Sequence, residues 1–361
     1  MRFELPFNVP GPRPVIAGTG LIALDVVIPN GPHSLPQLWA GGTCGNVLAV
    51  LAFLGWDAYP IARLRDDAAS RQITQDLSRW GVKPDFLAVN PDGSTPVIVQ
   101  HIHCTPGRGT THSFSRKCPS CGTRLPWYKP VRVSDATAIL PKLPALAVFF
   151  FDRTSAGAIH LAKQAANDGA LVVFEPSASA EEQQLRRAMQ VSHVVKYSED
   201  RMGSLEGLGR ELCVPLVIET RGDEGLRYLS RLKGGSDAWE KSQALPARDV
   251  VDTAGCGDWC TAGLIASLGR GGRDAFIGTT PARLREALRF GQALAAWNCR
   301  FEGARGGMYQ SDLPTFQESI RRLLAGDDSR STSPAIRAVP SNGPTAEYSC
   351  STCGESPAHH R

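Results

Sequence analysis

The sequence predicts an α/β protein with a mostly parallel central sheet that is covered by helices on both faces. Short apolar runs of strand length, such as "ALAVFFF" and "LVVF", alternate along the chain with longer amphipathic segments. Alternation of this kind places helices between parallel strands. Of the 361 residues, 42% are hydrophobic and 20% are charged, which is typical of a globular protein with a sizeable core.

The expected elements follow one another along the chain, and glycines end the first two helices. Two extended stretches are expected within 13–28. Further strands are expected at 58–64, 95–103, 145–152, 171–177 and 192–198, with two more within 213–230. Helices are expected at 45–54, 68–80, 155–170, 257–269 and 283–299. Residues 104–130 are rich in Gly, Thr, Ser, Arg and Pro and show no periodicity.

Charge and hydropathy narrow the class of protein. The formal net charge of +4 gives no reason to expect nucleic acid or an anionic membrane as the main partner. No apolar run approaches the roughly 20 residues of a membrane span, and prolines interrupt the N-terminal stretch "MRFELPFNVPGPRP". We therefore expect a cytoplasmic protein, in which the ten cysteines are mostly reduced thiols or metal ligands.

The stretch "DTAGCGDWCTAG" at 252–263 places a carboxylate, Asp258, at the start of a helix and behind a glycine loop. A helix N-terminus with nearby glycines can hold a phosphate against free backbone N–H groups. An acid beside that phosphate can accept the proton of an attacking hydroxyl. Asp258 could equally do no more than interact with the helix dipole, and this stretch alone leaves both interpretations open.

Five motifs together resemble the ribokinase-like (PfkB) carbohydrate kinases. "DTAGCGD" resembles the DTxGAGD signature of that family, and "GGTCGNVLAVLAFLG" (41–55) resembles its N-terminal signature. "GTGLIALD" (18–25) is similar to its first strand, and "ETRGDEG" (219–225) to its TxGxxG nucleotide loop. "EALRFGQALAAWNCRFEGA" (286–304) is similar to the helix beside the adenine. The resemblance implies a three-layer ribokinase-like fold with a small β lid.

The resemblance also implies roles for individual residues. Asp258 would be the general base, and the backbone of Ala254, Gly255, Cys256 and Gly257 would form the anion hole. The substrate would be held by Asp25, Gly42 and Asn46. Carboxylates and amides suit such a task because they hydrogen-bond hydroxyl groups. The nucleotide would contact Thr220, Gly222, Gly225, Asp252, Thr253 and Asn298. ATP would be accompanied by Mg²⁺, which neutralises the phosphates.

Three positions depart from the family pattern. Cys256 stands where alanine is usual, and we expect the helix N-terminus to lower the pKa of this thiol. The NxxE segment tied to Mg²⁺ reads "SEDR" (198–201), in which Glu199 could partly substitute. The usual Asp-Pro-Asn after a central strand reads "EPS". These departures permit a slow enzyme or an unusual substrate.

Two Cys-x-x-Cys turns, "CPSCG" and "CSTCG", predict a zinc site. Such turns point two thiolates at one metal ion, so Cys118, Cys121, Cys350 and Cys353 would supply four ligands for Zn²⁺. Two unrelated cysteine pairs or a redox Cys-x-x-Cys are the alternatives. Separate sites could use His101, His103, Cys104, His359 or His360, which could also be solvated side chains.

The expected organisation is a kinase domain at 1–325, a flexible Ser/Pro/Gly-rich linker at 326–349 and a C-terminal knuckle at 350–361. Lid segments would lie at about 26–40 and 94–136, the second carrying the first knuckle. We expect an ATP-dependent kinase acting on a sugar-like hydroxyl, with a possible homodimer through the lid. The alternatives are a nucleoside kinase of this fold and a catalytically weak binding protein that uses its zinc ribbon.

Overall fold

The computed structural model describes residues 5–7, 10–28, 36–105, 109–176 and 181–326. Its strands are β1 Val15–Thr19, β2 Ala23–Ile28, β3 Gln37–Gly41, β4 Asp57–Leu64, β5 Leu87–Val89, β6 Val97–Thr105, β7 Gly109–Ser115, β8 Val148–Phe151, β9 Leu171–Phe174, β10 Val194–Ser198, β11 Leu216–Thr220, β12 Leu226–Ser230 and β13 Trp239–Ser242. Its α-helices are α1 Thr43–Phe53, α2 Ala68–Arg79, α3 Val133–Ile139, α4 Ala156–Asn167, α5 Glu182–Gln190, α6 Glu199–Met202, α7 Glu206–Glu211, α8 Cys256–Leu268, α9 Gly272–Ile277, α10 Pro281–Asn298, α11 Gly306–Gln310 and α12 Leu313–Ala325.

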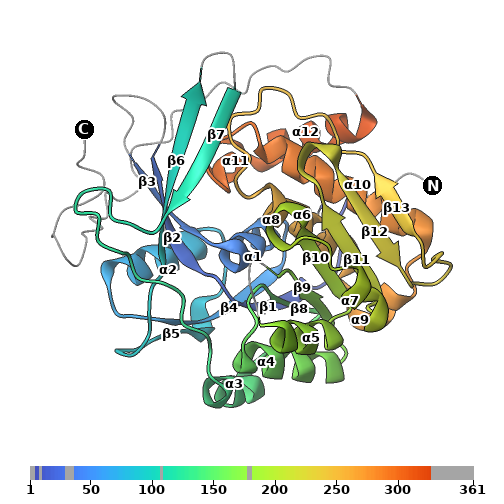
Figure 1. Ribbon diagram of the computed structural model, residues 1–361, viewed down its shortest axis with the longest axis horizontal. Coiled ribbons are helices and arrows are strands. Elements are labelled where there is room, and N and C mark those ends of the chain that lie inside the picture. The colour runs from blue at the N-terminus through green and yellow to red at the C-terminus, as the bar shows by residue number, and fades with distance from the viewer. Residues whose placement is uncertain (1–4, 8–9, 29–35, 106–108, 177–180, 327–361) are drawn as a thin grey trace.

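Nine strands form the main sheet, in the order β13-β12-β11-β10-β9-β8-β1-β4-β5 (Figure 1). The strands from β11 through β5 in this order pair in parallel, and β12 and β13 add antiparallel strands at one edge. Parallel strands bring their carboxyl ends to one edge, where open α/β sheets bind ligands. The segments that follow β8, β9, β10 and β11 therefore meet on the same side of the molecule.

The core lies on both faces of this sheet, because successive side chains of a strand point to opposite faces. Ile16, Phe150 and Val173 pack with residues of α1, α8 and α10. Ala17 and Phe149 point the other way and pack with α4 and α5. The result is the three-layer arrangement that the alternating strands and helices predict.

A second sheet, in the order β3-β2-β6-β7, projects from the main body (Figure 1). Strand β2 pairs in parallel with β6 and antiparallel with β3, and β7 folds back on β6. Strand β7 lies within 104–130, for which the sequence predicts no regular structure, because its Gly, Thr and Ser residues carry no alternating hydrophobic pattern.

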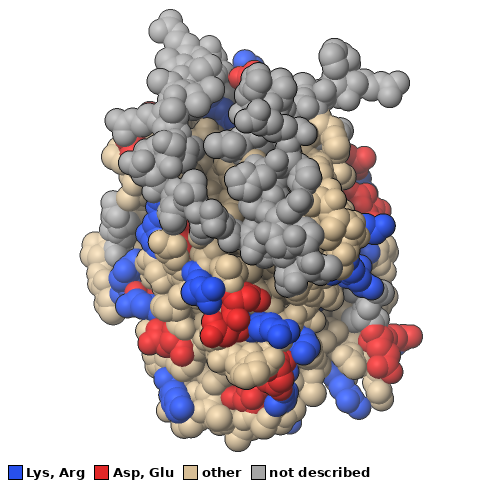
Figure 2. Space-filling model, turned by 90° about the vertical axis from the view of Figure 1, so that its left-hand side faces the viewer, with Lys and Arg blue, Asp and Glu red and all other residues tan. Residues whose placement is uncertain are grey.

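The surface shows charges of both signs. On the face drawn in Figure 2, Lys and Arg are interspersed with Asp and Glu over the described residues. This distribution is in keeping with the net charge of +4. Within the part of the chain that the structure describes, no helix combines the length and the apolar character that crossing a bilayer requires.

The helix that begins at the glycine loop packs unusually closely on its neighbour. A Cβ atom added at Gly263 of α8 would lie 2.6 Å from the Cα of Gly291 in α10. Only two glycines allow this approach, which holds α8 against α10 and so fixes where the N-terminus of α8 lies.

Gly263→Ala should therefore lower the free energy of unfolding, by about 1–3 kcal/mol, as overpacking of a tight core does. Urea denaturation of the whole chain measures the change. Gly207→Ala is the matched control, because a Cβ atom at this helical glycine of α7 meets nothing within 4 Å. That control should keep or raise stability by up to about 1 kcal/mol. Equal stabilities for the two variants would contradict the close packing.

Candidate functional site

The N-terminus of α8 lies where the main sheet meets the second sheet. Its N-cap, Gly255, adopts a left-handed conformation with φ 74°. A side chain at this position would also collide with the Ala304 carbonyl, since an added Cβ would lie 2.3 Å from that oxygen. Glycine is therefore required here both for the backbone conformation and for space.

Asp258 occupies the first turn of α8, and its carboxylate faces the start of α1. The Asn46 amide Nδ2 donates a hydrogen bond of 2.7 Å to Asp258 Oδ2, across 212 residues of sequence. Desolvation first, and then the nearby Glu175 carboxylate, raise the pKa of Asp258, which lies at about 7. The hydrogen bond from Asn46 and the charges of Lys196 and Arg201 act in the opposite direction. An acid with this pKa can take up a proton near neutral pH.

A buried ion pair lies beside Asp258. Lys196 of β10 contacts Glu175, which follows β9, with 2.8 Å between Nζ and Oε1. Thr261 of α8 donates its hydroxyl proton to the other oxygen of Glu175. Burial disfavours the charged form of Lys196, but the Glu175 carboxylate raises its pKa, so the ammonium stays protonated. A Cβ atom at Gly257 would lie only 3.7 Å from this nitrogen, so the ammonium is close to the glycine loop.

Asp25 lies on β2 against the two glycines that precede α1. Its carboxylate accepts a hydrogen bond from the backbone of Gly42, and burial raises its pKa to about 7. A Cβ atom at Gly41 would lie 1.8 Å from Asp25 Oδ2. The other oxygen, Oδ1, is buried and has no hydrogen-bond partner among the described residues. The structure therefore brings Asp25, Gly42, Asn46 and Asp258 to one place.

Asp252 connects the glycine loop to the second sheet. Its carboxylate is 2% exposed and accepts hydrogen bonds from the backbone N–H groups of Ala254 and Gly303. Two side chains of the β6–β7 hairpin reach the same carboxylate, Gln100 through Nε2 and His112 through Nδ1 at 2.9 Å. Burial opposes the ionisation of Asp252, but the hydrogen bonds from His112, Ala254 and Gly303 hold its pKa below the ordinary value.

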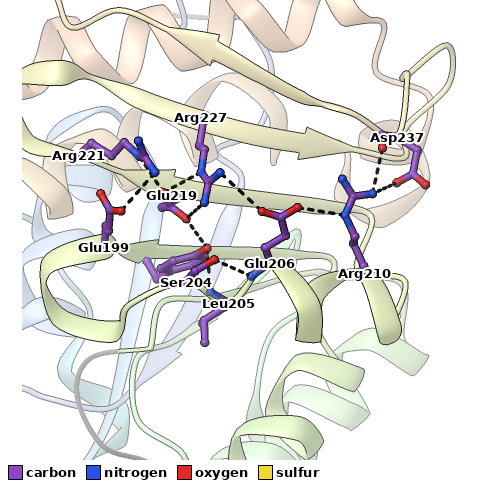
Figure 3. Close-up of polar contacts among 10 residues, drawn as sticks. Glu199, Ser204, Leu205, Glu206, Arg210, Glu219, Arg221, Arg227 and Asp237 are labelled. Carbon is purple, nitrogen blue, oxygen red and sulfur yellow. Dashed lines mark hydrogen bonds and ion pairs between the residues drawn. The ribbon is translucent and has the colours of Figure 1, made fainter.

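The predicted nucleotide loop follows β11. Gly222 and Gly225 have φ of 56° and 95°, and a Cβ atom at Gly225 would lie 2.3 Å from the Ser242 carbonyl. Thr220 donates its hydroxyl proton to the Tyr197 carbonyl. Behind the loop, the fully buried Glu219 pairs with Arg221 and Arg227 (Figure 3). This ion-pair cluster fixes the end of β11 and the conformation of the loop.

The remaining predicted nucleotide and metal residues differ in their surroundings. Thr253 is exposed beside the glycine loop. Asn298 is fully buried, and its amide contacts the backbone carbonyls of Ala254 and Ala304 and the N–H of Gly307. Glu199 points toward Arg221, with 3.2 Å between the carboxylate and the guanidinium (Figure 3). Asn298 thus braces the loop from behind, and the Glu199 carboxylate is already paired.

The expectation of a low thiol pKa at Cys256 is wrong. The Cys256 sulfur lies 2.8 Å from that of Cys299 at the end of α10. This hydrogen bond and burial raise the pKa of Cys256 well above its usual range, whereas the partner thiol Cys299 has a lowered pKa. The helix N-terminus is therefore outweighed by a neighbour that is distant in sequence.

The first predicted zinc knuckle lies in a turn after β7. Cys118 is buried, Cys121 is exposed, and the Gly122 N–H donates to the Cys118 carbonyl. The second pair, Cys350 and Cys353, lies outside the described residues, as do His359 and His360. Among the residues that the structure describes, no three His, Cys, Asp or Glu side chains gather as a metal site would require.

Lys196 and Arg305 are among the residues of this site that the sequence did not predict. Lys196 could have been found, because a lysine within the apolar strand "VVKYS" must be paired when buried. Arg305 is 1% exposed and contacts Asn46, and its position directly after the "GA" of the fifth motif carries no signal of burial.

Comparisons with known proteins show which proteins the chain resembles. Residues 152–310 match the pfkB family of carbohydrate kinases. The fructokinase of Klebsiella pneumoniae is 27% identical over 306 residues, which cover 80% of this chain and 94% of that protein.

Two solved structures are similar in fold. One is a fructokinase with bound ATP from Xylella fastidiosa, with a TM-score of 0.63 and 17% identity, covering 86% of this chain and 98% of that one. The other is a nucleoside kinase of Burkholderia thailandensis in complex with inosine, with a TM-score of 0.56 and 18% identity, covering 80% and 91%. These likenesses confirm the predicted ribokinase-like fold. Residues 152–310 thus resemble the pfkB family of carbohydrate kinases, and the similarities taken together support an ATP-dependent carbohydrate kinase.

Proposed function

We propose that the enzyme transfers the γ-phosphate of ATP to a hydroxyl group of a ketohexose-type sugar, with D-fructose as the first substrate to test. The observation that carries the proposal is the Asp258 carboxylate, which has a raised pKa and is held by Asn46 at the mouth of α8, directly behind the Gly255 loop. The fructokinase relative from Klebsiella pneumoniae supports the choice of sugar.

In this proposal, the residues fall into two groups, one for the transfer and one for the sugar. Asp258 removes the proton from the attacking hydroxyl, and the backbone of Gly255, Cys256 and Gly257 stabilises the negative charge of the transferring group. The N–H of Ala254, which we also expected in the anion hole, already donates to Asp252 Oδ1. Asp25, Gly42 and Asn46 orient the sugar, because hydroxyl groups can donate to Asp25 Oδ1 and accept from an amide. Positioning of this kind supplies much of the rate in phosphoryl transfer.

The nucleotide and its metal ion would lie between the loop after β11 and α8. Thr220, Gly222, Gly225, Asp252 and Thr253 would line this region, and the open space at Gly222, where an added Cβ meets nothing within 4 Å, fits a ligand that approaches the backbone. Asn298 would support the loop from behind rather than contact the nucleotide. Mg²⁺ neutralises phosphate charge when bound. Because Glu199 is paired with Arg221, we infer that Mg²⁺ is held mainly through phosphates and water.

The second sheet would act as the lid over the sugar. Strands β3 and β7 form its two edges, and an edge strand can pair with another chain. Phe114 on β7 is 54% exposed, which supports the proposed homodimer through this sheet.

One assay, which measures ADP release with a series of sugars and nucleosides, separates this proposal from two alternatives. A nucleoside kinase would release ADP with inosine in preference to sugars. Inosine is included among the acceptors because the structurally similar nucleoside kinase of Burkholderia thailandensis is in complex with it. A catalytically weak binding protein would release little ADP with any acceptor. In the altered "SEDR" segment, Arg201 stands where the family has a glutamate. Its positive charge lowers the pKa of Asp258 and so favours the deprotonated form that a base needs.

Asp258→Asn should lower turnover with D-fructose at least about 100-fold, the lower end for loss of a general base. The wild-type kcat/KM should fall as the pH drops below about 7, since the base is active only when deprotonated. ATP affinity, measured by calorimetry, should change little because the nucleotide contacts remain. A variant that keeps activity within a few-fold of wild type would remove Asp258 from the mechanism.

We also propose a zinc site formed by Cys118, Cys121, Cys350 and Cys353, within one chain or between two chains. The segment 326–348 is about 23 residues long, and a flexible chain of that length has an r.m.s. span of roughly 25 Å and reaches about 75 Å when extended. The second knuckle can therefore reach the first. Zinc bound beside the second sheet would stiffen the lid.

Deletion of residues 340–361 should abolish one bound zinc per chain, as measured by elemental analysis of the purified protein. It should also weaken sugar binding while leaving ATP binding and the unfolding transition of the kinase domain unchanged. Cys213→Ser, which alters an exposed cysteine far in sequence from both knuckles, should leave the zinc content unchanged. Zinc that remains after the deletion would exclude the shared site.

A further inference from the structure

Arg305 is a fully enclosed charge next to the proposed sugar site. It lies between α10 and α11 and is 1% exposed. Its Nε donates to Asn46 Oδ1 at 3.1 Å, and its Nη2 contacts Asp76 Oδ2 at 2.8 Å and the Ala40 carbonyl. The guanidinium thus connects the end of β3, helix α2 and the Asn46 side chain, which in turn contacts Asp258.

The contact with Arg305 determines which way the Asn46 amide faces. A guanidinium only donates hydrogen bonds, so the atom of Asn46 that faces it must be the oxygen. The NH₂ group of the same amide then faces Asp258, as observed. A flipped amide would place N–H against N–H on one side and oxygen against a carboxylate on the other. Two repulsive contacts would replace two favourable ones.

Arg305 is itself held firmly. Its partner Asp76 is 5% exposed and also accepts hydrogen bonds from the Ala40 N–H and the Tyr309 hydroxyl. Tyr309 stacks on Trp39 with 4.5 Å between ring centroids. The guanidinium therefore cannot turn away from Asn46 without breaking a buried network, which makes it a rigid support.

Arg305 also has one unsatisfied nitrogen. Its Nη1 is buried and has no hydrogen-bond partner among the described residues, as is true of Asp25 Oδ1. The two groups are close enough for the Arg305 charge to lower the pKa of Asp25, which burial raises. Both are buried polar atoms whose hydrogen-bonding capacity is unused among the described residues.

We propose that Arg305 is a positioning residue for phosphoryl transfer: it fixes the Asn46 amide so that Nδ2 faces the catalytic carboxylate. This inference rests on the proposed role of Asp258 as the base.

Loss of the guanidinium should act on Asp258 through Asn46. The other charged groups near Asp258 are Glu175 after β9, Lys196 on β10 and Arg201 on α6, and none of them contacts Arg305. In Arg305→Lys a single ammonium that pairs with Asp76 no longer reaches Asn46 as the forked guanidinium does, so the amide can flip, and the carboxylate then loses a donor and faces an oxygen. The pKa of Asp258 then rises above about 7, and the acid limb of the rate profile moves to higher pH.

The kinetic test uses ATP and D-fructose with wild type, Arg305→Lys, Asn46→Ala and the double variant. Arg305→Lys should lower kcat about 10- to 100-fold, the range for losing one charge-assisted hydrogen bond, and should raise the KM for fructose. In the Asn46→Ala background the same change should lower kcat by no more than about 3-fold, because the effect on the base passes through Asn46. If the effects of the two substitutions on kcat were fully additive, that would contradict this relay, in which Arg305 acts on Asp258 through Asn46.

A matched control separates positioning from stability. Arg63 is another buried arginine, paired with Asp92 and Asp135, neither of which belongs to the proposed site. Arg63→Lys should lower the unfolding midpoint as Arg305→Lys does, but should leave the pH profile unchanged. If Arg305→Lys does not fold, Asp76→Asn tests the same relay, because it leaves the guanidinium in place without its anchor and should shift the profile in the same direction.

Direct titration distinguishes failure of this inference from failure of the proposed function. The carboxyl carbon of Asp258 can be followed by NMR with labelled aspartate and assigned with Asp258→Asn. The midpoint of the Asp258 titration could rise in Arg305→Lys while the pH dependence of the reaction rate stays unchanged. That result would support the relay and reject Asp258 as the base. An unchanged midpoint together with kcat within about 2-fold of wild type would overturn the inference and leave Arg305 as a structural ion pair.

Discussion

Two helices begin at the same point in this enzyme, and the hydrogen bond between Asn46 of α1 and Asp258 of α8 joins them. Both have a glycine N-cap with positive φ, 77° at Gly42 and 74° at Gly255, and neither cap has a side-chain hydrogen bond. The dipoles of both helices favour negative charge here, although in α1 the N–H groups of Cys44 and Gly45 already donate to the Leu21 carbonyl. Asp25 satisfies the first helix, while Asp258 and the proposed phosphate share the second. The rest of the fold serves to hold these two helix ends together.

The surrounding layers do this by close packing and by buried charge. The Gly263–Gly291 approach fixes α8 on α10, and Arg305 with Asp76 fixes the strand end before α1. Asp252 ties the glycine loop to the second sheet through Gln100 and His112. A carboxylate beside a bound phosphate is electrostatically unfavourable by itself. In the proposed complex, the raised pKa of Asp258 and the neighbouring Lys196 ammonium would reduce this repulsion.

The sequence was sufficient for the fold class and for most of the central strands, because their apolar runs and glycine-ended helices follow regular periods. It also brought Asp25, Gly42, Asn46 and Asp258 into one site through the motifs that contain them. It could not predict strand β7, whose small polar residues show no alternation. Nor could it predict the Cys256–Cys299 contact or the Arg305 network, because those depend on α10 and the loop after it returning to the start of α8. Local patterns carry no information on such contacts between distant segments.

The central claim is that sugar and nucleotide meet at the mouth of α8. A crystal structure with D-fructose and a non-hydrolysable ATP analogue tests it most directly. The account predicts a fructose hydroxyl within hydrogen-bonding distance of Asp258, with other hydroxyls on Asp25 and Asn46 and the γ-phosphate against the N–H groups of residues 255–257. A sugar bound elsewhere, or a phosphate that points away from the Gly255 loop, would contradict it.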